Sequence, residues 1–599
     1  MSDGPTARVP GVSARPEEKP PFVPIIDLTP IAALTTLNAR RWEWWLNEEY
    51  GWLYPDLANQ IVDGIVHGVT IDYEGDRSNS RFGRNPPISV EHAAKVSEVI
   101  AEDVASLKKA GPFDRQPLEF FCVSPIGAVP KKNSVKVRVV HNLSHPFRGD
   151  SVNEGIEDGS LRLSSFGHAA RAVVMLGAGC WLIKLDVKAA YKLVPVRRED
   201  WCLLGFKWEG KWYYERVLPF GLRSSCRLWE LYAAALRHFI ARSLNLPFDR
   251  IVIHYVDDFL FVVKLKSDAR HLLTRALNLC EELGVPIASE KTEGPTTCLT
   301  FLGIELDTVA MESRLPPAKL LELQQLVDVW VSKSTASISE IESLHGTLRW
   351  ACGVVRPGRF YLRRLIAHSS RIKRWAQSDK AQFALPRLVI EDVRWWQQFL
   401  TRWNGVGLLY DADWIASDKL ELFTDACNTG YGGYYQGQWF AGRWTNEQLA
   451  AAHRRTRISM PFLELHAVVT AAGTFGHLWR GKKIIFRCDC GPVVHAIERC
   501  SSRREEMMHL LRCLSSIACD LGFDFKCSHI RGVDNEVADI LSRYADCAEF
   551  RALRPNAHLE PTISICPSLP APPDEQPTPS PKRKQSHFRR TSAHSSRRR

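Results

Sequence analysis

The chain has 599 residues, of which 45% are hydrophobic and 10% aromatic, so we expect several domains with sizeable buried cores. Its formal net charge is +11, but the last 18 residues hold eight Lys or Arg and no acid, which leaves +3 for the rest. The 16 cysteines form no CxxC pair and no run of 18 apolar residues occurs, which argues against a zinc ribbon, a disulfide-rich secreted fold and a membrane protein. We therefore expect a soluble intracellular protein with reduced thiols, cytoplasmic, nuclear or both.

Both ends of the chain, residues 1–24 and 556–599, are rich in Pro, Ser and charged residues, which predicts disordered termini. The basic tail admits three interpretations: a nuclear-import signal, a nonspecific nucleic-acid arm, or a solvated arm without a partner.

The region between the termini changes its pattern several times. Residues 25–114 predict an aromatic-rich helical lead-in, with a helix from the N-cap Ser89 to a stop at Gly111. Residues 115–310 alternate β-branched strands with helices, residues 311–400 have long helical periodicity, and residues 418–545 return to strands and helices. The chain is therefore predicted to have an α+β multidomain fold.

Two apolar strands in the first α+β region carry carboxylates. The segment "CWLIKLDVKAAY" (180–191) contains Asp186, and "IVIHYVDDFLFV" (251–262) contains Asp257 and Asp258. A hairpin near the second pair would aim Asp257 towards Asp186, and clustered carboxylates of this kind suit Mg²⁺ because cations relieve their repulsion. The alternative is that the two adjacent acids merely make a turn.

Neighbouring segments carry groups that suit phosphate and sugar binding. Lys131 and Arg138 lie in a basic hairpin that could grip a triphosphate, and Lys291 is a second phosphate candidate. The segment "LPFGLRSSCRLWE" (218–230) places Phe220 and Gly221 in a turn that could press on a template base or an incoming sugar.

These blocks, in this order with "FLGIEL" (301–306), resemble the reverse transcriptase family over about residues 115–400. The resemblance implies a right-hand polymerase with fingers and palm at 115–310 and a thumb at 311–400. It implies that Asp186, Asp257 and Asp258 are the catalytic carboxylates, holding two Mg²⁺ ions, with Mn²⁺ as the alternative. Tyr191 falls where a bulky ring excludes a ribose 2′-hydroxyl, which implies a DNA product.

Two positions depart from the family pattern. Ala189 stands where relatives often have Asp, and Cys226 stands where Pro is usual. Neither supplies a metal ligand, so the departures concern substrate positioning.

The second α+β region has its own set of acids, each at the end of an apolar element: Asp425, Glu464, Asp489 and Asp539. His529 lies ten residues before Asp539, where an imidazole could transfer a proton. The order of these residues, with "NEVAD" at the end, resembles RNase H over 418–545. The resemblance implies an RNase H-like α/β domain in which the four acids hold two Mg²⁺ ions and His529 assists product departure.

The two resemblances together imply an RNA template, a DNA primer, dNTPs and an RNA:DNA hybrid as partners. The text "ESLHGTLRWACGVVRPGRFYLRRL" most resembles the Pol proteins of DIRS-like retrotransposons, with gypsy-like elements second, and the former group adds a separately encoded recombinase as a partner. The Arg-rich segment 354–366 suits tracking of a nucleic-acid backbone or a solvated helix face. The open alternatives are a decayed or domesticated relative that binds nucleic acid without catalysis, and an RNA-dependent RNA polymerase, against which Tyr191 argues.

Overall fold

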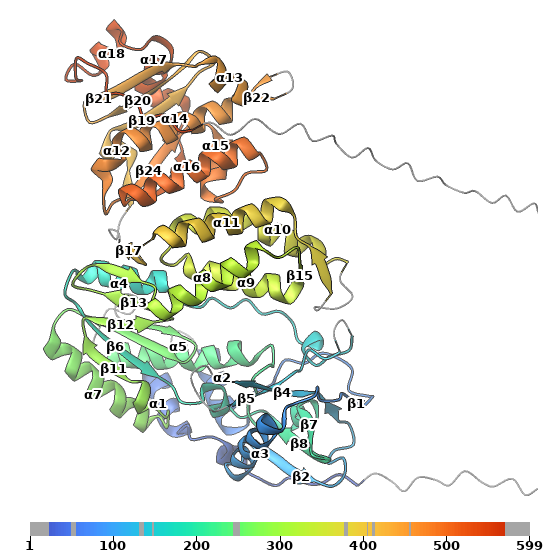
Figure 1. Cartoon of the computed structure of the whole chain (residues 1–599). Coiled ribbons are helices and arrows are strands. Elements are labelled where there is room, and N and C mark those ends of the chain that lie inside the picture. The colour runs from blue at the N-terminus through green and yellow to red at the C-terminus, as the bar shows by residue number, and fades with distance from the viewer. Residues whose placement is uncertain are drawn as a thin grey trace, which may run out of the picture. The chain divides into compact units, whose positions relative to one another are not determined.

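The structure is a computed structural model that describes residues 23–49, 55–130, 137–146, 149–243, 252–375, 381–403, 405–409, 414–454 and 457–568. The chain divides into two compact units, residues 1–414 with 481–483, and residues 415–480 with 484–599. Both units mix helices and sheets, so the predicted α+β multidomain fold is confirmed (Figure 1). Among the described residues, no helix has the length and apolar character needed to cross a membrane.

The first helices of the first unit pack against a central helix, α5. Trp42 of α1 is fully buried, and its ring lies 5.7 Å from that of Tyr232 and 5.6 Å from that of Phe239 in edge-to-face geometry. The early elements of this unit are η1 (Ile31–Leu34), α1 (Ala39–Glu49), α2 (Pro55–Val66), α3 (Val90–Ala105), η2 (Asn153–Gly155), α4 (Phe166–Leu176), η3 (Ala190–Leu193), η4 (Arg198–Leu203), α5 (Ser225–Ser243), α7 (Lys266–Glu282) and η5 (Ser289–Lys291).

The helix α3 begins as predicted, because the Ser89 side chain accepts a hydrogen bond from the His92 amide. Its predicted end at Gly111 was wrong: the helix stops at Ala105, and Leu107 has a left-handed φ of 62°. Residues 109–113 instead form a strand, β2, whose partner β8 lies far away in sequence and so leaves no local signal.

Three sheets lie in the earlier part of the first unit. A five-stranded sheet has the order β1-β3-β7-β8-β2, a hairpin joins β4 to β5, and a four-stranded sheet has the order β11-β6-β10-β9. Their strands are β1 (Arg81–Phe82), β2 (Lys109–Phe113), β3 (Cys122–Val123), β4 (Ile126–Pro130), β5 (Val137–His141), β6 (Trp181–Asp186), β7 (Gly205–Trp208), β8 (Lys211–Glu215), β9 (Val252–Tyr255), β10 (Asp258–Val263) and β11 (Glu293–Thr296). Helices α4, α5 and α7 pack on the last sheet, whose strand β10 is almost entirely buried.

The end of the first unit is mainly helical, as its long periodicity predicted. Helices α8 (Pro317–Val331), α9 (Ile338–Ala351), α10 (Arg363–Ile372) and α11 (Arg387–Arg402) pack together, α11 on α8 and α10 on α9 (Figure 1). The other elements here are η6 (Arg356–Tyr361), the pair β15 (Thr335–Ser337) and β16 (Gln382–Ala384), and the sheet of β12 (Cys298–Phe301), β13 (Ile304–Asp307), β14 (Glu312–Arg314) and β17 (Val406–Leu408).

The second unit has the antiparallel sheet β19-β20-β21, a sheet in the order β18-β24-β25 and the antiparallel pair β22-β23. Helix α14 is nearly all buried and packs on both β19 and α16. The elements are β18 (Trp414–Ala416), α12 (Ser417–Leu420), β19 (Leu422–Ala426), β20 (Gly430–Tyr435), β21 (Gln438–Arg443), α13 (Asn446–Ala452), β22 (His453–Arg454), β23 (Arg457–Ile458), α14 (Met460–Phe475), η7 (Gly476–Trp479), β24 (Lys483–Cys488), α15 (Gly491–Glu498), α16 (Glu505–Leu521), β25 (Asp524–His529), η8 (Gly532–Asn535), α17 (Glu536–Tyr544) and α18 (Ala548–Leu553).

The predicted start of a disordered tail at residue 556 was wrong. Residues 556–568, which we call the C-terminal strap, run along the second unit, where the His558 amide donates to the Gly437 carbonyl at 2.8 Å and the Thr562 amide to that of Trp439 at 2.7 Å. These backbone hydrogen bonds order a segment whose composition is typical of disorder. The rest of the predicted tail and residues 1–22 lie outside the described residues.

Candidate active sites

The first candidate site lies where β6 and β10 pair in antiparallel fashion. Asp186 is the register partner of Asp258, so the two side chains leave the same face of the sheet at neighbouring positions. Asp257 lies in the turn between β9 and β10, and its carbonyl accepts a hydrogen bond from the Val187 amide at 2.9 Å. The structure thus brings together the three acids predicted from two strands about 70 residues apart.

The turn that carries Asp257 is strained and braced. Val256 has a φ of 56°, which a β-branched residue rarely adopts. Helix α5 holds the turn at two points: the Trp229 indole donates to the Val256 carbonyl at 2.7 Å, and Glu230 pairs with the buried His254 at 2.7 Å. Packing against α5 therefore fixes the position of Asp257.

The described residues balance the negative charge of this site only in part. The Lys291 ammonium lies 2.9 Å from each carboxylate oxygen of Asp186. Burial and the neighbouring Asp186 charge raise the pKa of Asp257, and burial with the charges of Asp257 and Asp186 raises the pKa of Asp258 to about 6. A site that resists losing its protons in this way favours the binding of cations.

The residues predicted to bind a nucleotide surround this site in part. The Tyr191 ring lies 5.4 Å from the Phe220 ring, and the Arg138 guanidinium lies 5.0 Å above Phe220. Gly221 has a φ of 110°, and a Cβ there would come within 2.0 Å of the His141 carbonyl oxygen, so only glycine fits. Lys131 lies outside the described residues.

Ala189 and Cys226, the two departures from the family pattern, both lie close to Tyr191. Ala189 has a left-handed φ of 54° and precedes η3, the turn that carries Tyr191. Burial, and next the neighbouring Cys226 side chain, raise the pKa of the Tyr191 hydroxyl. The cysteine thus contacts the ring predicted to select the sugar.

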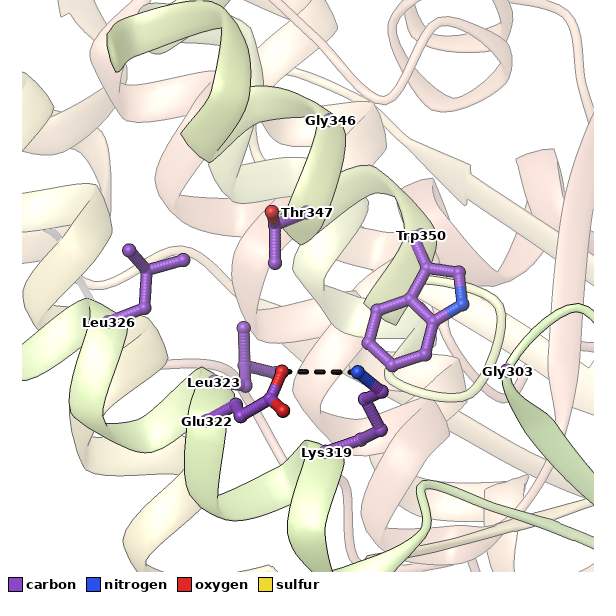
Figure 2. Close-up of a pocket in the computed structure, with 8 residues that line it drawn as sticks. All are labelled: Gly303, Lys319, Glu322, Leu323, Leu326, Gly346, Thr347 and Trp350. Atoms are coloured by element: carbon purple, nitrogen blue, oxygen red, sulfur yellow. Dashed lines mark hydrogen bonds and ion pairs between the residues drawn. The ribbon is translucent and has the colours of Figure 1, made fainter. Parts of the chain in front are cut away.

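A pocket of about 570 Å³ lies beside the β12–β13 turn (Figure 2). Its walls come from that turn and from α8 and α9: α8 supplies apolar Leu323 and Leu326 along with the Lys319–Glu322 ion pair at 3.1 Å, and α9 supplies Trp350. The Trp350 indole donates to the Leu302 carbonyl at 2.9 Å and so ties α9 to the turn. The pocket belongs to this helical pair and not to the carboxylate site.

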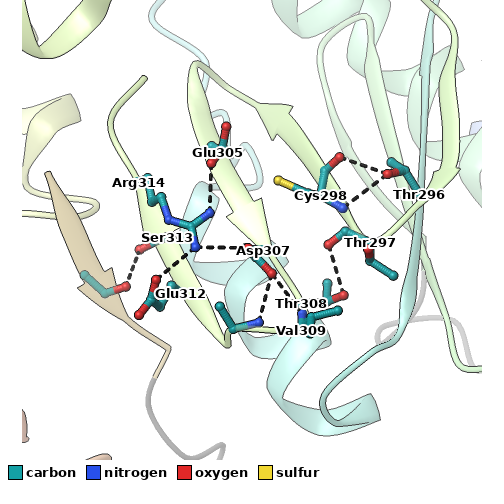
Figure 3. A network of polar contacts seen from close by, with 12 residues as sticks. Thr296, Thr297, Cys298, Glu305, Asp307, Thr308, Val309, Glu312, Ser313 and Arg314 are labelled. Atoms are coloured by element: carbon teal, nitrogen blue, oxygen red, sulfur yellow. Dashed lines mark hydrogen bonds and ion pairs between the residues drawn. The ribbon is translucent and has the colours of Figure 1, made fainter. Parts of the chain in front are cut away.

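The hairpin that carries this turn is stiffened by a polar network on β13 and β14 (Figure 3). The Arg314 guanidinium donates to Glu305 at 3.0 Å and to Asp307 and Glu312 at 2.9 Å each. Asp307 also accepts the amides of Val309 and Ala310 and closes the next turn. These contacts hold in place residues 301–306, the segment "FLGIEL".

The second candidate site gathers one acid from each of four elements. Asp425 comes from β19, Glu464 from α14, Asp489 from the end of β24 and Asp539 from α17. Asp425 and Glu464 are buried, at 5% and 7% exposure, and Ser542 donates to Asp425 at 2.7 Å. The structure thus brings the four predicted acids to one place.

The charges of these acids act on one another. Burial and the charges of Asp425 and Asp489 raise the pKa of Glu464 to about 9, and burial with Asp489 and Asp539 raises the pKa of Asp425 to about 6. The more exposed Asp539 is paired with Arg543 at 2.8 Å. Among the described residues, no basic side chain forms an ion pair with Asp425 or Glu464, so protons or cations from solution can neutralise them.

His529 ends β25, and its Nε2 lies 3.1 Å from the Asp489 carbonyl oxygen, which puts the imidazole at the edge of this site. Sequence reasoning missed Cys488, whose sulfur lies within 4.8 Å of ligand oxygens of Glu464 and Asp489. Its position directly before Asp489 was the only available signal. Donor sets of this kind, rich in carboxylate oxygen, fit divalent cations.

Comparisons with known proteins bear on the first site. Residues 129–306, which include the three acids of that site, match the family described as reverse transcriptase (RNA-dependent DNA polymerase). The chain is similar to Protein P of duck hepatitis B virus (strain Germany/DHBV-3), 29% identical over 29% of this chain and 21% of that protein. It is also similar to the Gag-Pro-Pol polyprotein of human T-cell leukemia virus 3 (strain 2026ND), 29% identical over 24% of this chain and 9% of that one.

The chain thus spans only a small part of the curated relatives that it matches. Among solved structures, it is similar to the foamy viral protease-reverse transcriptase dRH in complex with double-stranded DNA. That similarity has a TM-score of 0.44 at 15% identity and covers 85% of this chain and 84% of the other.

Proposed function

We propose, from the reverse transcriptase domain at residues 129–306, that this chain is an RNA-directed DNA polymerase with a linked RNase H activity. The observation that carries the proposal is the register of β6 and β10, which sets Asp186 opposite Asp258 beside the turn of Asp257. A second carboxylate site on the same chain suits removal of the RNA strand from the hybrid that the polymerase makes.

Both sites fit divalent ions, because each gathers carboxylates whose pKa is raised by burial and by the charges of the neighbouring acids. When bound, two Mg²⁺ ions, or Mn²⁺ in their place, supply charge stabilisation to the attacking and leaving oxygens of phosphoryl transfer. Asp186, Asp257 and Asp258 would hold them in the first site. Asp425, Glu464, Asp489 and Asp539 would hold them in the second.

The remaining residues of the first site orient the substrates. Arg138, Lys131 and Lys291 supply positive charge for the triphosphate of a dNTP, and Phe220 and Gly221 form the turn against the sugar or template base. Tyr191 excludes a ribose 2′-hydroxyl by its bulk. The Lys291 ammonium would have to leave Asp186 before this carboxylate could hold a metal ion, because the ammonium contacts both carboxylate oxygens.

The residues of the second site position the RNA strand of an RNA:DNA hybrid for hydrolysis. His529 stands beside Asp489 and is suited to pass a proton to the departing group. Ser542 orients Asp425 through its hydrogen bond, and Arg543 forms an ion pair with Asp539.

The helical part of the first unit would hold the RNA template and DNA primer. The exposed face of α10 carries Arg363 and Arg371, which suits phosphate contacts. We further propose that the chain belongs to a DIRS-like retrotransposon, with a gypsy-like element as the second choice, and that it acts in the cytoplasm or nucleus with a separately encoded recombinase.

Primer extension on an RNA template tests the polymerase, with dNTPs compared with rNTPs and wild type compared with Asp257→Asn. We expect Mg²⁺-dependent dNTP incorporation that the substitution abolishes. Binding of the template without incorporation would favour the decayed relative, and preferential use of rNTPs would favour an RNA-dependent RNA polymerase.

A further inference from the structure

A cluster of four buried or half-buried charges lies behind the turn that carries Tyr191. Lys109 of β2 is 3% exposed, and its ammonium lies 2.7 Å from both carboxylate oxygens of Glu215 on β8 and 3.0 Å from Asp103 at the end of α3. The ammonium of Lys192, the residue after Tyr191, lies 2.5 and 2.7 Å from the two oxygens of Asp103.

Lys192 balances the charge of the buried Asp103 in this cluster. Lys109 and Glu215 are direct partners across β2 and β8 and would balance each other alone. Asp103 is 6% exposed and adds a second buried negative charge, for which Lys192 supplies the second cation. Withdrawal of Lys192 would take from the buried Asp103 the ammonium that contacts both of its oxygens, and Lys109 is already paired with Glu215, so this loss is unfavourable.

The main chain of the same turn is held as well. The Lys108 ammonium donates to the Lys192 carbonyl at 3.1 Å, so both the side chain and the backbone of this residue are fixed from the α3–β2 corner. Within the turn, the Lys192 amide donates to Ala189 at 2.8 Å and the Val194 amide to Tyr191 at 3.1 Å. Tyr191 therefore sits on a turn clamped from outside, between two fixed neighbours.

We propose that Asp103 and Lys108 are positioning residues for sugar selection, which hold Lys192 and thereby fix the Tyr191 ring against an incoming ribose 2′-hydroxyl. The inference rests on the proposed polymerase function and adds to it residues that never touch the nucleotide. A ring excludes a hydroxyl only if it cannot retreat, because about 1 Å of movement is enough to lose a steric contact of this kind.

The test is the ratio of kcat/KM for a dNTP to that for the matching rNTP in primer extension by the full chain. We expect Lys192→Met to lower this ratio by about tenfold, which corresponds to about 1.4 kcal/mol. Lys192→Arg should restore most of it, because a guanidinium can still donate to Asp103. Lys108→Met, which removes a single hydrogen bond from a half-buried site, should lower it less and leave the fold intact.

Glu215→Gln is the control within the same cluster, since Glu215 is buried and its carboxylate pairs with Lys109 and not with Lys192. It should lower the Tm without changing the ratio. An unchanged ratio in both Lys192→Met and Lys108→Met, or an equal change in Glu215→Gln, would overturn the inference.

Hydrogen exchange of the Lys192 and Val194 amides gives a readout that does not depend on polymerase activity. We expect faster exchange in Lys192→Met and wild-type rates in Glu215→Gln. If wild type incorporates no dNTP, the proposed function fails, and these amides still decide whether the clamp exists: equal exchange in all variants rules it out.

Discussion

The two carboxylate sites differ in how their negative charge is balanced. In the first, the Lys291 ammonium contacts both oxygens of Asp186. In the second, the paired acid is the more exposed Asp539, whereas the buried Glu464 has a pKa raised to about 9 by burial and its neighbours. When bound cations are removed, the Lys291 side chain should therefore balance part of the negative charge of the first site, and protons should neutralise the buried acids of the second.

The largest expected effect separates the two sites by activity. Asp257→Asn should reduce dNTP incorporation by at least about 10³-fold, because several kcal/mol of transition-state charge stabilisation are lost and 1.36 kcal/mol is tenfold. Asp489→Asn should do the same to hydrolysis of a labelled hybrid. Both activities are measured for both variants.

Each variant is the control for the other, because the acids belong to different compact units. Loss of both activities from one substitution would break the comparison, since it would mean that the two sites do not act separately.

A smaller effect concerns His529, which has no equivalent among the described residues of the first site. His529→Ala should slow hydrolysis by about 10²-fold through loss of proton transfer, while the four carboxylates stay in place. Mn²⁺ binding measured by electron paramagnetic resonance should be unchanged. A loss of binding equal to the loss of rate would assign the imidazole to the metal site instead.

The next prediction concerns the Lys291 ammonium, whose removal would leave the acids of the first site without this partner, as Glu464 is in the second. Lys291→Met removes the ammonium from Asp186 and should tighten Mn²⁺ binding in the absence of nucleotide by about fivefold, equivalent to about 1 kcal/mol for a partly exposed ion pair. Lys188→Met, which removes another exposed lysine near Asp186, is the control. Equal affinities for wild type and Lys291→Met would show that the lysine does not compete with cations.

The smallest effect is on stability. Because the pKa of Glu464 is raised to about 9 in the folded state, the folded chain keeps this proton while the unfolded chain loses it near pH 4.5, so stability falls as pH rises between these values. Glu464→Gln in EDTA should remove this dependence and raise the Tm at pH 8.5 by about 3 °C. Calorimetry at pH 6 and pH 8.5 checks it. A wild-type Tm that rises with pH over this range would contradict the assigned direction.

The acids of both sites could be predicted because a carboxylate that interrupts an apolar strand stands out from its neighbours, as Asp186 and Asp257 do. Their convergence followed from strand ends, although the register that sets Asp186 opposite Asp258 depends on pairing across the chain. The roles of these residues stay predictions until the variants are measured.

Other features left no local signal. The contact between Lys291 and Asp186 joins residues 105 positions apart. Asp103 and Lys109 look like surface charges in the sequence, and only the pairing of β2 with β8 buries them. The C-terminal strap has a composition typical of disorder, yet hydrogen bonds to Trp439 and to the Thr474 hydroxyl order it.

The C-terminal strap also decides where this chain can be shortened. It satisfies the Gly437 and Trp439 carbonyls on and beside β21, and the His558 carbonyl accepts the Trp439 indole at 2.8 Å. A protein cut after residue 545, where the family motifs end, would present β21 as an open strand edge next to an uncovered tryptophan. Such edges recruit strands from other molecules, so a shortened second unit should aggregate while one that ends after Ser568 stays dispersed.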